Sequence, residues 1–147
     1  LPSEESAIAL SFLDRRSNQS VSNTEIIREF HCIQSLTKGL ASKAYRPYTN
    51  LFLSDETIQQ QLHAKLSHFY VEINKRIPSL ERYPIDVQEA ILDMTYNLGV
   101  NGLFTKFPNF IEAFIKQDWE TCALECNRKG ISETRNAATS ELFKRSQ

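Results

Sequence analysis

The stretch YPIDVQEAILDMTYNLG, residues 83–99, decides the fold class because it has the spacing of an amphipathic helix. Pro84 stands where a first-turn proline is favoured, and Gly99 stands where helices commonly end. Between them, residues recur at intervals of three and four, so they share one helix face. These positions are Ile85, Gln88, Ile91, Leu92, Thr95 and Leu98.

Six further helix starts lie outside this stretch, and each is a residue type favoured at an N-terminal cap or first turn. They are marked by Ser3, Ser22 or Asn23, Ser54, Pro108, Asp118 and Ser132. The longest of these helices runs for about five turns and stops before Pro78. Residues 15–22 and 45–48 are predicted to be irregular connections. The pattern predicts about seven helices, no strand, and one all-α domain over residues 1–147.

Composition agrees with a helical globular protein. Hydrophobic residues make up 41% of the chain, and only 4 Gly and 5 Pro are present, too few for a β-rich or disordered chain. The 17 basic and 18 acidic residues leave a net charge of −1. Because basic residues are not in excess, nucleic acid is not expected as a partner. The sequence contains no run of about 20 apolar residues, so no membrane span is predicted.

The cysteines and histidines predict neither a metal site nor a redox site. Cys122 and Cys126 lie four residues apart on a predicted helix, with Cβ atoms about 6 Å apart, which is too far for a disulfide. With Cys32 they make an odd number, so they are expected to be small apolar residues of a helix interface. His63 and His68 are five apart and do not share a helix face. No metal or other cofactor is predicted.

Five sequence features follow one another in a fixed order over residues 83–143. They are Tyr83-Pro84 with the run that ends in Tyr96-Asn97-Leu98-Gly99, then Gly102-Leu103, Phe107-Pro108, Asp118-Trp119, and Gly130-Ile131-Ser132 with Arg135-Asn136. In this order the chain resembles the helical lobe of the phage-type lysozymes, the muramidases of glycoside hydrolase family 24. A weaker similarity upstream is to lysozyme domains of type VI secretion effectors. It lies in Glu25-Ile26 with Phe30, Gly39 with Ala41 and Tyr45, and Leu53-Ser54 with Ile58.

The resemblance implies an enzyme that cleaves peptidoglycan between N-acetylmuramic acid and N-acetylglucosamine. In this family a Glu that precedes a Gly protonates the glycosidic oxygen, and an Asp some nine residues later and a Thr-Ile-Gly-x-Gly-His hairpin complete the site. This sequence has neither the Glu-Gly pair nor the hairpin motif, so the N-terminal β-hairpin lobe is expected to be missing. The catalytic Glu is therefore expected upstream of Leu1, in a longer protein whose C-terminal part is residues 1–147.

One alternative keeps the catalytic pair inside the chain. Glu5 and Asp14 are nine residues apart, like the family's Glu and Asp. However, Val21-Ser22-Asn23-Thr24 follows where the family needs a hairpin that contains glycine, and carboxylates at a given spacing are common. The upstream Glu is the favoured prediction.

Four residues are predicted to contact the glycan or to support the site. Tyr96 and Asn97 fit stacking on, and hydrogen bonding to, an N-acetyl sugar. Arg135, with Asn136 beside it, matches the family's terminal-helix arginine, which points into the cleft toward the catalytic acid. Structural alternatives stay open: Asn97 as a local helix cap, and Arg135 paired on the surface with Glu133 or Glu141.

Two further residues have competing interpretations. Asp93 lies four residues after Glu89, so an acid/base pair on one helix face is conceivable. An Asp satisfied by a neighbouring Arg or by a helix N-terminus is the favoured prediction. Trp119 is expected in the core rather than as a sugar platform.

Three functions remain compatible with these residues: a muramidase effector, an inactive lysozyme-like module that binds peptidoglycan, and a helical interaction or inhibitor protein. The muramidase is favoured. It implies peptidoglycan glycan strands and the missing N-terminal segment as partners, with an immunity protein or a secretion-system component as further candidates. Residues 1–5, LPSEE, lack the features of a signal peptide. Export by a specialised route, with action in the bacterial periplasm or cell wall, is therefore expected.

Overall fold

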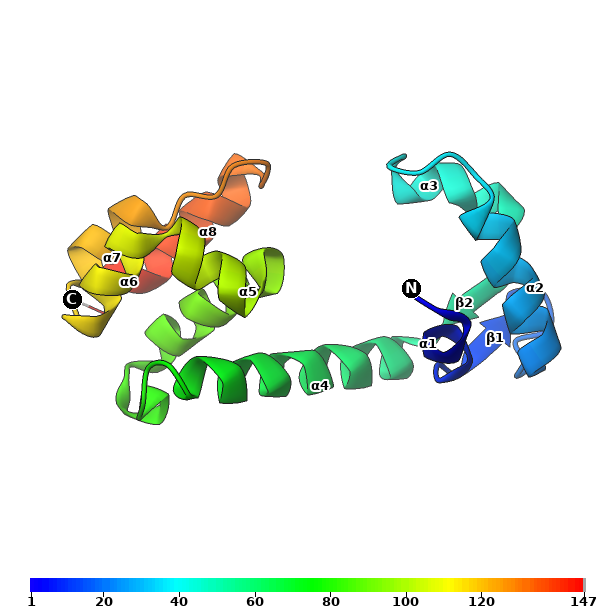
Figure 1. Cartoon of the computed structure of the whole chain (residues 1–147), viewed down its shortest axis with the longest axis horizontal. Coiled ribbons are helices and arrows are strands. Elements are labelled where there is room, and N and C mark those ends of the chain that lie inside the picture. Colours follow the sequence, from blue (N-terminus) through cyan, green and yellow to red (C-terminus); the bar gives the residue numbers. More distant parts are fainter. Residues whose placement is uncertain (147) are drawn as a thin grey trace. The chain divides into compact units, whose positions relative to one another are not determined.

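The structure is a computed structural model that describes residues 1–146, and helices dominate it (Figure 1). Helix, with the 3-10 turns included, accounts for 66% of the described residues, which confirms the predicted all-α class. Within residues 1–146 the helices are α1 (Glu4–Ile8), α2 (Asn23–Gln34), α3 (Ser42–Tyr45), α4 (Asp55–Asn74), α5 (Ile85–Lys106), α6 (Pro108–Ile115), α7 (Trp119–Glu125) and α8 (Glu133–Lys144). Two short 3-10 helices, Arg46–Tyr48 and Leu80–Arg82, complete them.

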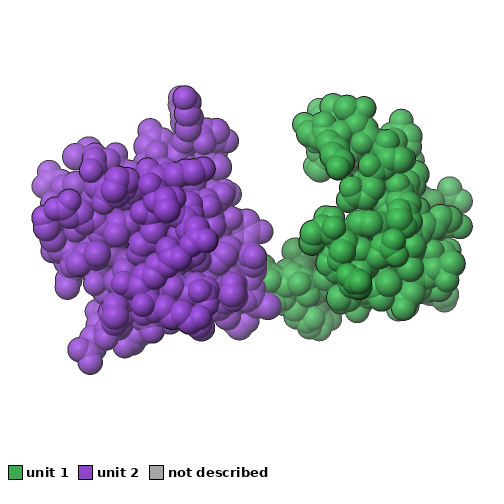
Figure 2. Space-filling model, in the orientation of Figure 1, with its two compact units in different colours: residues 1–62 green, residues 63–147 purple. Residues whose placement is uncertain are grey.

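The chain contains two compact units, Leu1–Leu62 and His63–Gln147, and the division falls within α4 (Figure 2). The sequence predicts one helical domain, and the structure distinguishes these two units within it. Unit 1 holds α1 to α3 and the first part of α4, and unit 2 holds the remainder of α4 and α5 to α8.

The predicted helix starts are confirmed where a side chain caps the helix. Asp118 accepts from the backbone N–H of Thr121 at 3.0 Å, and Ser132 accepts from that of Arg135 at 3.4 Å. Ser3, Ser22 and Ser54 likewise accept from the backbone N–H three residues ahead. Each cap satisfies a first-turn donor that has no partner inside its helix.

The prediction of no strand was wrong. β1 (Phe12–Asp14) pairs antiparallel with β2 (Leu51–Leu53), with Phe12 opposite Leu53 and Asp14 opposite Leu51. An isolated bridge also joins Leu13 to Ser20. Strands of three residues are too short to show the alternation by which a strand is recognised in sequence. The segment predicted as an irregular connection at residues 45–48 is also helical, because α3 ends there and a 3-10 helix follows.

Gly99 interrupts α5, as the sequence predicts for a helix-ending glycine, but helix resumes directly after it. Its φ of 67° and ψ of 160° lie in a region that is open in practice only to glycine. The preceding segment ends with Tyr96, Asn97 and Leu98, so the break defines the end of the helix that carries the predicted sugar-contact residues.

The main hydrophobic core belongs to unit 2. It gathers an aromatic cluster in which the Phe114 ring lies 5.2 Å from that of Tyr83 and 5.5 Å from that of Trp119. Phe110 and Phe143 complete the cluster. Aliphatic side chains from α4 and α5 and from the segment between them pack against it, including Ile73, Leu80, Val87, Ile91, Met94 and Leu103.

Unit 1 has few buried side chains, and Ala7 and Ile26 are its buried hydrophobic residues. Hydrogen bonds to the carboxylate of Glu29 connect two of its segments. Glu29 of α2 accepts from the backbone N–H groups of Asn50 and Leu51 at 3.2 and 3.3 Å, and also from the Thr49 hydroxyl. These bonds hold the start of β2 against α2.

Candidate functional site

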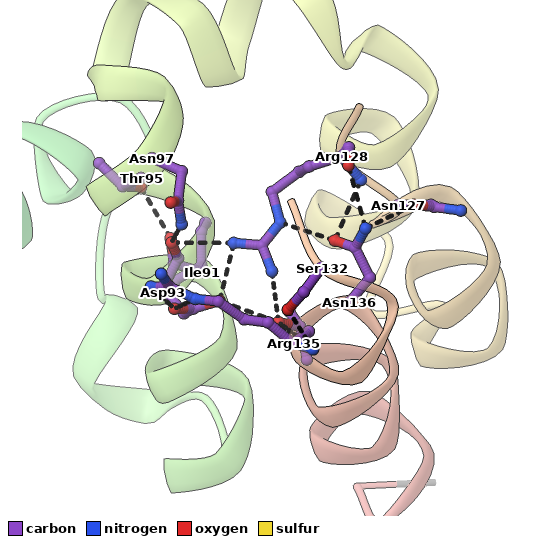
Figure 3. A network of polar contacts seen from close by, with 10 residues as sticks. Ile91, Asp93, Thr95, Asn97, Asn127, Arg128, Ser132, Arg135 and Asn136 are labelled. Carbon is purple, nitrogen blue, oxygen red and sulfur yellow. Dashed lines mark hydrogen bonds and ion pairs between the residues drawn. The ribbon is translucent and has the colours of Figure 1, made fainter. Parts of the chain in front are cut away.

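The four residues predicted to contact the glycan or to support the site lie on two helices of unit 2 that pack together, α5 and α8. Tyr96 and Asn97 lie just before the break at Gly99, and Arg135 and Asn136 lie in the first turn of α8. A network of polar contacts joins the two helices (Figure 3).

Asp93, on α5, is central to this network, and its two carboxylate oxygens have different partners. Oδ1 accepts from Nε of Arg135 at 3.0 Å and also from its Nη2. Oδ2 lies 2.7 Å from Nη1 of Arg128 and accepts from the Thr139 hydroxyl at 2.9 Å. The favoured prediction that a neighbouring Arg satisfies Asp93 is confirmed. Glu89 is exposed and takes no part in the network.

Arg128 is a buried residue of this network that the sequence does not single out, and the same is true of Thr139. The Arg128 side chain is only 1% exposed, and all three guanidinium nitrogens have partners. Nε donates to Asn136 Oδ1 at 3.1 Å, Nη2 donates to Thr139 Oγ1 at 2.6 Å, and Nη1 donates to the main-chain carbonyl of Asp93 at 3.1 Å. A buried cation is tolerated only when it is paired and hydrogen-bonded in this way. Nothing in the local sequence distinguishes Arg128 from its neighbour Lys129.

Asn136 is partly buried, and its side-chain amide contacts Arg128 and Asn127. Its Oδ1 accepts from both the backbone N–H and Nε of Arg128, and its Nδ2 donates to the Asn127 side chain at 2.7 Å and to the carbonyl of Arg128 at 3.0 Å. Both ends of the amide are therefore used inside the fold.

Asn97 and Tyr96 keep groups available to a ligand. Asn97 donates from Nδ2 to the carbonyl of Asp93 at 2.8 Å, the same carbonyl that accepts from Arg128. Its Oδ1 has no partner within residues 1–146. Tyr96 is 48% exposed, and its ring stands edge-on to that of Phe69, with centroids 6.5 Å apart.

The pKa of Asp93 is held below its ordinary value. Burial of the carboxyl opposes its ionisation, but hydrogen bonds from Arg135, Arg128 and Thr139 outweigh that effect. Two guanidinium groups face one carboxylate here, so the cluster carries one positive charge in excess. Arg135 pairs with Asp93 rather than with Glu133 or Glu141, the surface alternative that the sequence leaves open.

Within residues 1–146, every carboxyl group with a shifted pKa has a pKa below its ordinary value, which bears on catalysis. A general acid for glycoside cleavage needs a raised pKa so that it holds its proton near neutral pH. The shifted groups are Asp14, Glu72, Asp93, Glu112, Asp118 and Glu141. None of these six is therefore suited to protonate a glycosidic oxygen.

Glu5 and Asp14, the alternative catalytic pair, lie in unit 1. Glu5 is exposed in the first turn of α1. Asp14 ends β1, and its Oδ1 accepts from the backbone N–H groups of Arg16 and Ser17 at 3.0 and 2.8 Å. These bonds lower the pKa of Asp14, with the Ser17 backbone contributing most. Asp14 thus serves as a turn cap, and the hydrogen bonds that it accepts favour its ionised form.

The remaining candidates of the sequence have structural roles. Trp119 is buried in the aromatic cluster, as predicted. Cys122 and Cys126 are buried, as expected for residues of a helix interface, and burial raises the pKa of the Cys122 thiol to about 12. Across residues 1–146, no three His, Cys, Asp or Glu side chains are grouped so that they could hold a metal ion.

Comparison with known proteins gives no further assignment. No family model, curated protein or solved structure matches the chain. Among the helices of residues 1–146, none has the length and apolar character needed to cross a membrane.

Proposed function

We propose that this chain acts on bacterial cell-wall glycan as the helical part of a lysozyme-type muramidase. Its sugar-binding surface would be the glycan face, which we define as the side chains of Tyr96, Asn97 and Arg135. The observation that carries the proposal is the hydrogen bonding of Arg135 to Asp93, because it ties the arginine of the last helix to the helix that bears Tyr96 and Asn97.

The glycan face offers three complementary contacts to an N-acetylated sugar. The half-exposed ring of Tyr96 suits stacking against the apolar face of a pyranose. The Oδ1 of Asn97 can accept from an acetamido N–H. Nη1 of Arg135 has no partner within the part of the chain described, so it can donate to a sugar hydroxyl or to the carboxylate of a muramyl group.

A second candidate function, binding of peptidoglycan without cleavage, is favoured by one observation. All six carboxyl groups with shifted pKa are shifted toward ionisation, as described above, whereas glycosidic protonation needs a neutral carboxylic acid. In the muramidase proposal the acid is a residue other than these six.

The place of action follows from the substrate and is part of the same proposal. Peptidoglycan lies outside the cytoplasmic membrane, so the protein would be exported and would act in the periplasm of a target bacterium. As an effector it would also meet an immunity protein in cells that must survive it.

Co-sedimentation with purified peptidoglycan sacculi, combined with the release of new reducing ends, tests the proposal. The 147-residue chain is compared with Tyr96→Ala, Arg135→Ala and, as a matched control, Tyr48→Ala, which removes a 53% exposed tyrosine from unit 1. We expect the wild-type chain and Tyr48→Ala to sediment with sacculi and the two glycan-face variants to remain in solution.

The two readouts separate the candidate functions. Because the catalytic Glu is expected upstream of Leu1, the release of reducing ends is measured with the longer protein that contains that Glu. Release by the longer protein supports the muramidase, and sedimentation without release by the longer protein supports the binding module. A wild-type chain that stays in solution, or equal sedimentation of all four proteins, would rule out the glycan face as the sugar-binding surface.

A further inference from the structure

Arg128 lies where the contacts of the glycan face converge. Its Nη1 is bonded to both the carboxylate and the main-chain carbonyl of Asp93. The carboxylate then holds Arg135, and the carbonyl also accepts from Asn97. Arg135 and Asn97 of the glycan face are thus both hydrogen-bonded to Asp93, which Arg128 contacts directly.

The fork of a guanidinium is well suited to this arrangement. Nε, Nη1 and Nη2 point in fixed directions within one plane, and here they reach Asn136, Asp93 and Thr139 respectively. These partners come from α5 and α8, whereas Arg128 lies in the segment between α7 and α8 (Figure 3). A lysine has a single ammonium at the end of a flexible chain, which cannot occupy three such directions at once.

The Asp93 carboxylate links buried Arg128 to the exposed side chain of Arg135. Arg128 and Thr139 bind Oδ2, so the plane of the carboxylate is set from its buried side. Oδ1 is then presented to Arg135, whose side chain is 43% exposed. An exposed arginine on a helix surface ordinarily samples many rotamers, and here two of its nitrogens share one anchored oxygen.

We infer that Arg128 is a positioning residue for the glycan face: it anchors the carboxylate and carbonyl of Asp93 and thereby orients Arg135 and Asn97 toward the sugar. The inference rests on the proposed function for its consequence in sugar binding. Arg128 itself is buried and does not touch the glycan.

Two substitutions remove the anchor in different ways. Arg128→Met removes the charge and every hydrogen bond of the side chain, and Arg128→Lys keeps a charge but loses the fork. Phe143→Leu is the matched control, because it weakens the buried core on the same α8 helix and leaves every polar contact of Asp93 in place. Thermal unfolding establishes that each variant is folded before it is compared.

Three measurements report how each substitution at Arg128 affects Asp93, Arg135 and the binding of sacculi. The ¹³C carboxyl signal of Asp93 gives its titration midpoint, the Nε–H signal of Arg135 gives the order of that side chain, and co-sedimentation with sacculi gives binding. In Arg128→Met we expect the midpoint of Asp93 to rise, because a cation is lost. We also expect the Arg135 Nε–H to exchange rapidly with water, and binding to fall to the level of Arg135→Ala.

Arg128→Lys separates charge from positioning and serves alone should Arg128→Met fail to fold. It should keep part of the lowered midpoint of Asp93 while losing the ordered Nε–H of Arg135 and the binding. Phe143→Leu should lower thermal stability and leave all three measurements as in wild type. The double variant Arg128→Met/Arg135→Ala should bind no more weakly than Arg135→Ala, because both changes remove the same interaction.

Specific outcomes overturn the inference. A folded Arg128→Lys or Arg128→Met that keeps the Arg135 Nε–H signal and wild-type sedimentation shows that Arg128 does not position the face. Losses in the double variant that add show that the two residues act separately. If the wild-type chain fails to bind sacculi, the proposed function fails, while the Asp93 and Arg135 signals still decide whether Arg128 positions these groups.

Discussion

Nη1 of Arg128 lies 2.7 Å from Oδ2 of Asp93, and this ion pair joins two residues that are 35 positions apart in the sequence. Because the Arg128 side chain is 1% exposed, its charge depends on Asp93 for compensation. Leaving such a charge unpaired costs several kcal/mol. The stability of unit 2 is therefore linked to the ionisation of Asp93.

We expect acid to destabilise unit 2 through Asp93. The folded-state pKa of Asp93 lies below its ordinary value, so its contribution to the free energy of unfolding is fully present above the ordinary value of 3.8. That contribution is lost as the pH falls through the folded-state pKa. Thermal midpoints measured by circular dichroism between about pH 6 and about pH 2 should fall for wild type and fall less for Asp93→Asn. If the thermal midpoints of wild type and Asp93→Asn fell equally with pH, ionisation of Asp93 would not be what stabilises unit 2.

Removal of the Asp93 carboxylate at neutral pH should be far more damaging than removal of a surface carboxylate. Asp93→Ala leaves Arg128 buried without its counter-charge, so we expect the free energy of unfolding to fall by about 3 kcal/mol. Glu112→Ala breaks the ion pair with Lys116, whose atoms lie 2.6 Å apart on an exposed helix face, and should change stability little. Urea titration of both variants checks the contrast, and equal losses would count against it.

Phe114 and Ile115 are adjacent on α6, but truncation should cost much more stability at Phe114 than at Ile115. Phe114 is fully buried among Tyr83, Trp119 and Phe143, whereas Ile115 is 56% exposed. Phe114→Ala should lower the free energy of unfolding by about 3–5 kcal/mol, and Ile115→Ala should stay within about 0.5 kcal/mol of wild type. Chemical denaturation measures both changes, and a small effect at Phe114 would mean that the aromatic cluster is not packed as described.

Of two glycines of α5, only Gly99 should lose stability when it is replaced by alanine. At Gly99 a new Cβ would meet no atom within 4 Å, yet its backbone conformation is strained for any other residue, so Gly99→Ala should cost about 1–3 kcal/mol. Gly102 lacks a positive φ, and its Cβ would lie 3.5 Å from that of Leu98. Gly102→Ala should be neutral or stabilise the protein by up to about 1 kcal/mol. Thermal unfolding distinguishes the two variants. A stabilised Gly99→Ala would show that Gly99 does not adopt the positive-φ conformation that interrupts α5.

The three thiols should react in two classes. Cys32 is exposed, whereas Cys122 and Cys126 are buried, and burial raises the pKa of both buried thiols. Because the thiolate is the reactive form, a chromogenic disulfide reagent at about pH 8 should modify Cys32 alone in the folded chain and all three cysteines after denaturation. Rapid reaction of more than one thiol in the native protein would show that α7 is open to solvent.

Sequence alone identifies those parts of this fold whose determinants are local. Asp118 and Ser132 cap helices through backbone groups only three residues away, so their residue types suffice to predict a helix start. The pairing of Phe12 with Leu53 depends on two distant segments, neither long enough to show an alternating pattern. The same limit applies to the site: Tyr96, Asn97 and Arg135 belong to recognisable motifs, whereas Arg128 is defined only by partners that folding brings to it.

Trp119 is the single tryptophan of the chain, and it is packed against Tyr83, Phe114 and Phe143 in unit 2. Its near-ultraviolet signal therefore reports the packing of that unit and does not respond to the unfolding of unit 1. Backbone circular dichroism reports the helices of both units together. The difference between the two signals tells, in one unlabelled sample, whether the two units melt as one cooperative body or in succession.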